Sequence, residues 1–252
     1  MNKSWTRSRN LLYGCIGILS LVIAWQVLSV SGVAGITVPR PAAVFGIYRN
    51  VALAALLLRS AHATVESALS GFAVGTFLGV VTALVAHLFP ILRPGLDRLA
   101  VVLNAVPAIA LGPIFIVLFS RELTPAVLAT TPTFFIVYVA AVAGLGSSSP
   151  AHAAMITTFG ARKSQVVLYL NLPAAIPHLL SGMKVSVTAA MIGAIVGEWF
   201  GAPAGLGVVI VNTLENFQVP LMWATILVVA AISLTGYGLL TIAESWAERK
   251  FV

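Results

Sequence analysis

Long apolar stretches recur along this chain and restrict its fold more than any other feature. The chain has 252 residues, of which 60% are hydrophobic and only 8% are charged, whereas soluble domains carry roughly a quarter charged residues. A lipid bilayer offers the backbone no hydrogen-bond partners, so only helices and closed barrels cross it. The runs do not alternate between apolar and polar residues as barrel strands do, and we therefore expect an all-α membrane protein.

Six stretches have about the 20 residues that a helix needs to cross a bilayer. They lie near Leu11–Val30, Thr64–Leu88, Leu96–Phe119, Pro125–Leu145, Met183–Phe200 and Pro220–Ala243. The piece between the first two, Ala42–Leu58, is shorter and amphipathic, and we expect it to be interfacial. Within the second stretch, Gly71, Gly75 and Gly79 form a stripe of small residues at which another helix can approach closely.

The positions of Lys and Arg orient these spans, because cytoplasmic loops carry the excess of positive charge. With the amino terminus inside, ten of the 14 are cytoplasmic, namely Lys3, Arg7, Arg9, Arg93, Arg98, Arg162, Lys163, Lys184, Arg249 and Lys250. The other four are Arg40, Arg49, Arg59 and Arg121. A span at Ala42–Leu58 would spoil this asymmetry, so we expect six spans with both termini cytoplasmic. The same asymmetry explains the net charge of +7 without a nucleic-acid partner.

This topology divides the chain into four segments. Residues 1–34 form a cytoplasmic tail and the first transmembrane helix, and residues 35–63 form an extracytoplasmic or interfacial segment. Residues 64–246 form a core of five transmembrane helices with a cytoplasmic loop at 147–182, and residues 247–252 form a cytoplasmic tail. The loop at 147–182 is the part least like a membrane span. We expect two short helices joined at Gly160, the second of which ends at Leu172-Pro173 because a residue before proline avoids helical angles.

The sequence contains no arrangement of residues typical of an enzyme. It has no G-x-x-x-x-G-K-[ST] motif, and its four histidines lack the spacing of metal ligands, so we expect neither nucleotide nor metal to bind this chain. Glu198, near the end of the fifth span, is the acidic residue of most interest. It could line a pathway, anchor the following glycine-rich turn by accepting backbone hydrogen bonds, or reach headgroup water beside Trp199.

The loop resembles the cytoplasmic coupling loop of the permease subunits of bacterial ABC importers. That pattern is Glu-Ala-Ala, three residues, Gly, and about nine residues to Leu-Pro, and Gly160 and Leu172-Pro173 match its later part. Val38–Pro41, Asn104–Pro107 with Gly112-Pro113, and Gly197–Gly207 resemble further segments of the group that moves taurine, alkanesulfonates and nitrate. The resemblance covers roughly residues 35–245 and implies the type I importer permease fold.

One departure from the pattern lies in the loop itself. Counting back from Gly160, the family's glutamate falls at Ala154, which Met155 and Ile156 follow in place of two alanines. Because buried apolar side chains can anchor an interface, we expect a compensated contact. The residues expected to form or close the ATPase-coupling loop are Ala154, Met155, Ile156, Phe159, Gly160, Ala161, Arg162, Leu172 and Pro173.

The resemblance also implies partners and a mechanism. Two copies of the chain would form the pathway, and two ATPase subunits, which hold the ATP and Mg, would push on the loops around Gly160. An extracytoplasmic binding protein would deliver the solute. The candidate pathway residues are Asn104, Pro107, Pro113 and Glu198; the prolines at 107, 113 and 132 fit either broken helices that line a cavity or kinks for packing.

Three questions stay open at the level of sequence: the source of energy, the charge of the solute, and the composition of the dimer. A secondary transporter or channel that works without ATP is the alternative, although the sequence has no buried relay of ionisable residues and no repeat between its halves. A membrane-bound enzyme would need a reactive constellation that is missing. The four outer arginines suit an anionic solute, but they could equally face lipid headgroups or the binding protein. The choice between homodimer and heterodimer is likewise undecided.

Overall fold

The computed structural model describes residues 3–33 and 35–251, and within these ranges it contains helices and turns but no strand. The expectation of an all-α chain is confirmed. The elements in order are α1 (Lys3–Ser31), α2 (Pro41–Ile47), α3 (Val51–Leu88), α4 (Arg93–Ala105), α5 (Ala108–Leu118), α6 (Thr124–Leu145), α7 (Pro150–Thr158), α8 (Lys163–Val166), the π-helical turn η1 (Val167–Asn171), α9 (Leu172–Glu198), α10 (Leu206–Glu215) and α11 (Val219–Phe251).

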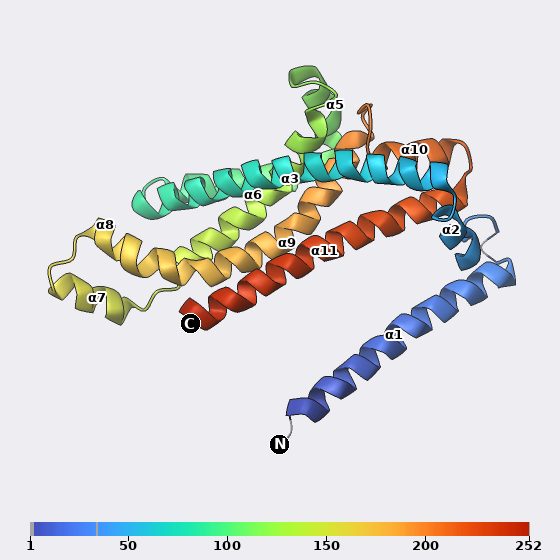
Figure 1. Ribbon diagram of the computed structural model, residues 1–252. Coiled ribbons are helices and arrows are strands. Elements are labelled where there is room, and N and C mark those ends of the chain that lie inside the picture. The colour runs from blue at the N-terminus through green and yellow to red at the C-terminus, as the bar shows by residue number, and fades with distance from the viewer. Residues whose placement is uncertain (1–2, 34, 252) are drawn as a thin grey trace.

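Helix α6 lies at the centre of the bundle, with α3 packed along one side and α9 along another (Figure 1). The predicted glycine stripe forms the first of these contacts. A Cβ atom on Gly75 would lie 2.8 Å from the carbonyl oxygen of Thr130, and one on Gly79 would lie 2.9 Å from that of Phe134. Real Cβ atoms do not approach backbone so closely, and the glycines therefore set the separation of α3 and α6.

Glycines also set the contact between α6 and α9. A Cβ atom on Gly193 would lie 2.7 Å from Cα of Ala129, and one on Gly197 would lie 2.9 Å from the nitrogen of Pro125. Helix α11 packs on the other side of α9 (Figure 1). Small residues at such interfaces replace the hydrophobic driving force that is absent between helices in lipid.

The third predicted span is broken, as its prolines indicated. Helices α4 and α5 meet at an angle of 96°, and the break lies at Val106-Pro107. Val106 has ψ 121°, the extended conformation that a following proline imposes. Pro113 lies inside α5 without ending it. As a result, α5 projects away from the long helices of the bundle (Figure 1).

Helix α3 begins earlier than the sequence predicted. It runs without a break from Val51 to Leu88, so the second half of the expected interfacial piece Ala42–Leu58 belongs to it. Asn50 caps its start, where its side-chain oxygen accepts the backbone N–H groups of Ala52 at 3.0 Å and Leu53 at 3.2 Å. Ser60 and Thr64, near the predicted start of the span, are buried, and the Thr64 hydroxyl donates to the Ser60 carbonyl at 3.1 Å.

The prediction that a helix ends at Leu172-Pro173 is wrong. Elements α8, η1 and α9 form one continuous helical segment, Lys163–Glu198. The backbone N–H of Leu172 donates to the carbonyl of Val167, five residues back, instead of the residue four back. Proline in a regular α-helix clashes with the carbonyl four residues earlier, and this wider turn next to Pro173 lets the helix pass through the proline.

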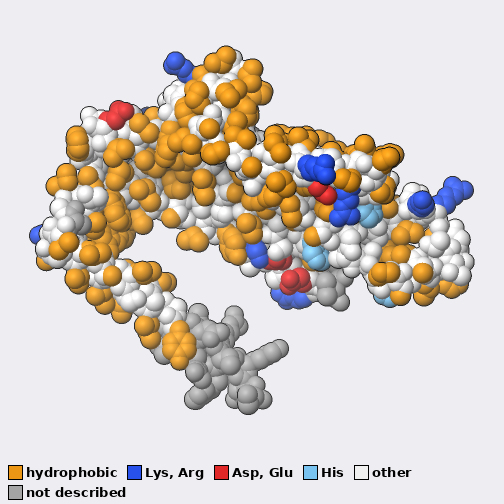
Figure 2. All heavy atoms as spheres, turned by 180° about the vertical axis from the view of Figure 1, so that it is seen from behind, with side chains coloured by type: hydrophobic (Ala, Val, Ile, Leu, Met, Phe, Trp, Pro, Cys, Tyr) orange, Lys and Arg blue, Asp and Glu red, His pale blue; other side chains and the backbone are white. Residues whose placement is uncertain are grey.

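Among the described residues, four helical segments are long and apolar enough to cross a membrane, and the bent α4–α5 pair makes up to five. The four are Val51–Leu88, Thr124–Leu145, Lys163–Glu198 and Val219–Lys250. The predicted first span, Leu11–Val30, begins outside the residues whose side chains are described; the described apolar stretch of α1 is Ile16–Ser31, and the expected sixth span stays a prediction. Hydrophobic side chains cover most of the visible face, and its charges gather mainly over the end that carries α7 and α8 (Figure 2).

Segments before α3 are fastened to the start of α11. Trp25 of α1 stacks on Trp223 with ring centroids 5.2 Å apart, and its indole N–H donates to the Pro39 carbonyl at 3.0 Å. The Trp223 indole donates to the Thr37 carbonyl at 3.1 Å. The rest of α1 extends away from the bundle (Figure 1).

Candidate functional site

The segment between α6 and α9 protrudes from one end of the bundle (Figure 1). Leu145 and Asn171 are buried, but no residue between them is. We call residues 146–170 the protruding loop. Helix α7 begins with Pro150, at a position where the missing N–H costs no hydrogen bond. The loop therefore contains the two short helices that the sequence predicted, α7 and α8, although the second continues into α9.

Gly160 makes the turn between the two helices. Its φ is +88°, in the left-handed region where a side chain is unfavourable. The N–H of Gly160 donates to the Thr157 carbonyl at 2.9 Å, and the N–H of Ala161 donates to that of Ile156 at 3.1 Å. These bonds satisfy carbonyl groups at the end of α7. Beyond the turn, the N–H of Arg162 donates to the Gln165 side chain at 2.8 Å and starts α8.

At the tip of the loop, around Gly160, two large apolar side chains are open to their surroundings. Met155 is 58% exposed and Phe159 is 80% exposed, and their spacing of four residues places them on one face of α7. Ala154 is exposed beside them, while Ile156 is half-buried. The sequence-predicted residues Ala154, Met155, Phe159, Gly160 and Arg162 are thus exposed at the surface of the loop tip, and Ile156 and Ala161 are half-buried there.

Leu172 and Pro173 do not belong to that surface. Both are half-buried where η1 joins α9, and Leu172 packs against the cluster that contains Tyr138, Leu145 and Ala175. They lie at the base of the protruding loop, where the chain re-enters the bundle.

Glu198 ends α9 and is only 2% exposed. One of its carboxylate oxygens, Oε2, accepts the backbone N–H of Gly207 at 2.6 Å, and the Thr64 hydroxyl oxygen accepts that of Leu206 at 2.7 Å. The first N–H groups of α10 are thereby paired with side chains of α9 and α3. Oε1 of Glu198 is buried with no hydrogen-bond partner among the described residues. The arrangement is that of an anchor for the glycine-rich turn.

The other three candidate pathway residues lie elsewhere. Asn104, Pro107 and Pro113 are all exposed on the α4–α5 pair. The structure therefore separates them from the buried carboxylate of Glu198, and the four residues do not form a single surface within one chain.

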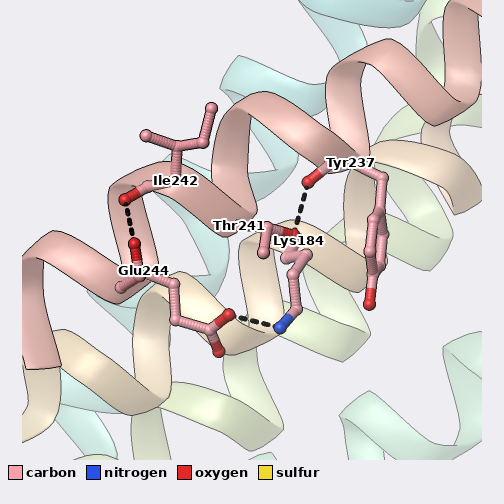
Figure 3. Close-up of polar contacts among 6 residues, drawn as sticks. Lys184, Tyr237, Thr241, Ile242 and Glu244 are labelled. Atoms are coloured by element: carbon pink, nitrogen blue, oxygen red, sulfur yellow. Dashed lines mark hydrogen bonds and ion pairs between the residues drawn. The ribbon is translucent and has the colours of Figure 1, made fainter. Parts of the chain in front are cut away.

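An ion pair that the sequence did not predict joins two of the long helices. Lys184 of α9 bonds to Glu244 of α11, and their side chains are only 16% and 12% exposed (Figure 3). The Lys184 ammonium also lies 5.6 Å from the ring centroid of Tyr237. Glu244 directly follows the last predicted span, Pro220–Ala243, and the sequence assigned it no role. The spacing of Lys184 and Glu244 in sequence carries no signal of their contact.

The chain matches the family model of the binding-protein-dependent transport system inner membrane component over residues 75–249. It is 28% identical to the formylaminopyrimidine transport permease protein ThiX of Halalkalibacterium halodurans over 92% of each chain. It is 26% identical to the putative aliphatic sulfonates transport permease protein SsuC of Bacillus subtilis, over 84% of this chain and 78% of that one. These relatives confirm the resemblance of the loop and its flanking segments to importer permeases.

The fold is shared with a solved structure. A chain from inward-facing conformations of the MetNI methionine ABC transporter superposes with a TM-score of 0.62 at 17% identity, covering 81% of this chain and 99% of that chain. Since the family match spans more than half of the residues and this fold agrees with it, the protein belongs to the family of binding-protein-dependent transport inner membrane components, the non-catalytic permease subunits of ABC transporters.

Proposed function

We propose that this chain forms the membrane pathway of an ATP-driven importer and receives the work of ATP hydrolysis through the protruding loop. The observation that carries this proposal is the exposed apolar tip around Met155 and Phe159. Apolar anchors of this kind become favourable when a partner's pocket covers them. A cytoplasmic ATPase subunit, which supplies the bound ATP and Mg, is the proposed partner, and both termini of the chain lie on its side of the membrane.

The tip can serve without the glutamate that the family pattern places at Ala154. The residues proposed for contact are Ala154, Met155, Ile156, Phe159, Gly160, Ala161 and Arg162. Arg162, exposed beyond the turn, supplies a charge at the edge of the apolar surface. Leu172 and Pro173 act from the base of the loop, where the packing of Leu172 against the bundle fixes the direction in which the loop leaves it.

A second copy of the chain completes the proposed pathway. The bent α4–α5 pair leaves Val102, Ile114 and Val117 exposed, and Asn104 in the last turn of α4 and Pro107 in the connection are exposed as well. Two such pairs that face each other would cover this apolar surface and place the broken backbone along the pathway. Irregular backbone at membrane depth is tolerated only where it is buried in protein or lines a water-filled cavity.

The proposed cargo is a small anionic solute delivered by an extracytoplasmic binding protein. Four arginines support this charge preference on the extracytoplasmic side: Arg40, Arg49, Arg59 and Arg121. Positive charge at the mouth of a pathway raises the local concentration of anions.

Purification of the tagged protein from its native membranes, followed by mass spectrometry, tests the coupling. A Walker-motif ATPase should co-purify with the wild-type chain and be lost from Met155→Asp/Phe159→Asp. Thr157→Asp is the matched control, because Thr157 lies on the opposite face of α7 and its hydroxyl bonds only to the Ala153 carbonyl. Absence of an ATPase from the wild-type sample, under conditions that keep other importers intact, would refute the proposal.

A further inference from the structure

Asn171 is the first buried residue after the protruding loop, and its side chain joins three segments. Its Nδ2 lies 2.8 Å from Nε2 of His87, in the last turn of α3. Its Oδ1 accepts the hydroxyl of Ser148, which precedes α7, at 2.9 Å. One amide group therefore connects the entry of the loop, the exit of the loop and the end of α3.

One tautomer of His87 satisfies both hydrogen bonds of the Asn171 amide. An amide nitrogen can only donate, so Nε2 of His87 accepts and the ring proton lies on Nδ1. The amide oxygen in turn accepts from Ser148. Asn171 is 7% exposed, and a buried amide that loses either partner pays the cost of an unsatisfied polar group.

The backbone at this point is also unusual. Asn171 ends the π-turn η1, whose wider hydrogen bond from Leu172 to Val167 allows the helix to pass Pro173. A π-turn inside an α-helix often marks a functional position. Here it lies between a loop with no buried residue and a helix that packs through the whole bundle.

We propose that Asn171 is a positioning residue that makes the protruding loop and α3 move together. This inference rests on the proposed coupling function. A push on α7 displaces both stems of the loop, and Asn171 carries that displacement to His87 and hence to α3. Without the amide, the loop can turn about the π-turn while α3 stays in place, and binding of the ATPase no longer moves the bundle.

The test measures a distance between two spin labels in the complex purified with its ATPase. In a Cys15→Ser background, labels are placed at Lys163→Cys, at the start of α8, and at Ile91→Cys, in the turn after α3; both native residues are exposed. Distances are recorded without nucleotide and after trapping with Mg-ATP and orthovanadate. The wild-type distribution should be the same in both states, whereas Asn171→Leu should show a shift larger than the wild-type width.

Two further variants separate transmission from folding. Asn171→Asp keeps acceptors for the Ser148 hydroxyl and for a His87 ring N–H, and it should restore the wild-type behaviour. His87→Leu removes only the contact with α3 and should show the same shift as Asn171→Leu. If Asn171→Leu fails to fold, His87→Leu provides the test. Thr241→Ala, which removes a hydroxyl bonded only to the Tyr237 carbonyl of its own helix (Figure 3), should behave as wild type.

The outcomes distinguish this inference from the function on which it rests. A preparation without ATPase refutes the coupling function and the inference with it. A preparation with ATPase refutes the inference alone in any of three cases. The first is a nucleotide-dependent shift of the label distance in the wild type. The second is an unchanged label distance in both Asn171→Leu and His87→Leu. The third is an Asn171→Asp variant that behaves like Asn171→Leu.

Discussion

Gly160 and Glu198 each act on the backbone of the chain. Gly160 supplies a positive φ at the tip of the protruding loop, and Glu198 supplies an acceptor to the start of α10. The two positions have different surroundings. A Cβ atom on Gly160 would meet nothing within 4 Å, whereas the Glu198 side chain is buried. A change at Gly160 therefore tests conformation alone, and a change at Glu198 tests a buried hydrogen bond.

Gly160→Ala should weaken co-purification of the ATPase without a matching change in the thermal stability of the bundle. A side chain in the left-handed region costs ~1–2 kcal/mol, and the cost falls on a loop with no buried residue. Gly160→Asn is the control, because asparagine tolerates this region better than alanine. Equal loss of the ATPase from both variants would contradict the conformational explanation.

Glu198→Ala should lower the thermal unfolding temperature of the detergent-solubilised protein. The variant leaves the buried N–H of Gly207 without its acceptor, a loss of about 1–3 kcal/mol. Glu198→Gln retains an acceptor oxygen and should lose less. If both variants unfold at the wild-type temperature, the carboxylate does not anchor α10.

Pairs of helices are held together by two kinds of contact, close packing at glycines and an ion pair. Glycines allow the backbones of α3 and α9 to come into contact with the backbone of α6, while α9 and α11 share the ion pair of Lys184 and Glu244. The close packing depends on the absence of side chains, and the ion pair depends on the presence of two opposite charges. Substitutions that add volume should therefore disturb the first, and substitutions that remove one charge should disturb the second.

Gly75→Val should destabilise the protein, because the new side chain meets Thr133 and the Thr130 carbonyl on α6. Overpacking of this kind costs about 1–3 kcal/mol. Gly95→Ala is the matched control, since a Cβ there has nothing within 4 Å. Thermal unfolding of both variants decides the matter, and an unaffected Gly75→Val would show that α3 and α6 can separate freely.

Lys184→Met or Glu244→Gln should each lower the unfolding temperature, because the partner is left as an unpaired charge among apolar helices. The double exchange Lys184→Glu/Glu244→Lys restores opposite charges and should recover part of the loss. A double exchange that is less stable than both single variants would mean that the local surroundings, and not the pair, determine stability.

At the scale of the whole molecule, the helices define two ends. The protruding loop lies at one end, and the turn between α10 and α11 follows the opposite end of α9. If the loop is cytoplasmic, Ser164 and Gln218 lie on opposite sides of the membrane. Both are exposed, so each can report its side when it is replaced by cysteine in a Cys15→Ser background.

A membrane-impermeant maleimide should label Gln218→Cys in right-side-out vesicles and Ser164→Cys only in inverted vesicles. The expectation follows from the excess of Lys and Arg on the loop side. The reverse pattern would place the loop outside the cell, where no ATPase could reach it.

The sequence by itself determined the helical class, the break at Pro107, the glycine stripe of α3 and the turn at Gly160, because each depends on local chemistry or on periodicity along one helix. It misplaced the start of α3 and the course of the chain at Leu172-Pro173. Ser60 and Thr64 are buried inside the continuous helix α3, and the π-turn beside Pro173 was not predicted from the sequence.

Contacts between distant residues were decided by the tertiary structure alone. Lys184 with Glu244, Asn171 with His87, and Thr64 with the start of α10 join helices that are far apart in sequence. For Glu198, the sequence left three interpretations open, and only burial beneath α10 distinguishes an anchor from a pathway residue. Such contacts depend on how the helices are rotated and how closely they approach, and the glycines that set that approach act only once the helices are packed together.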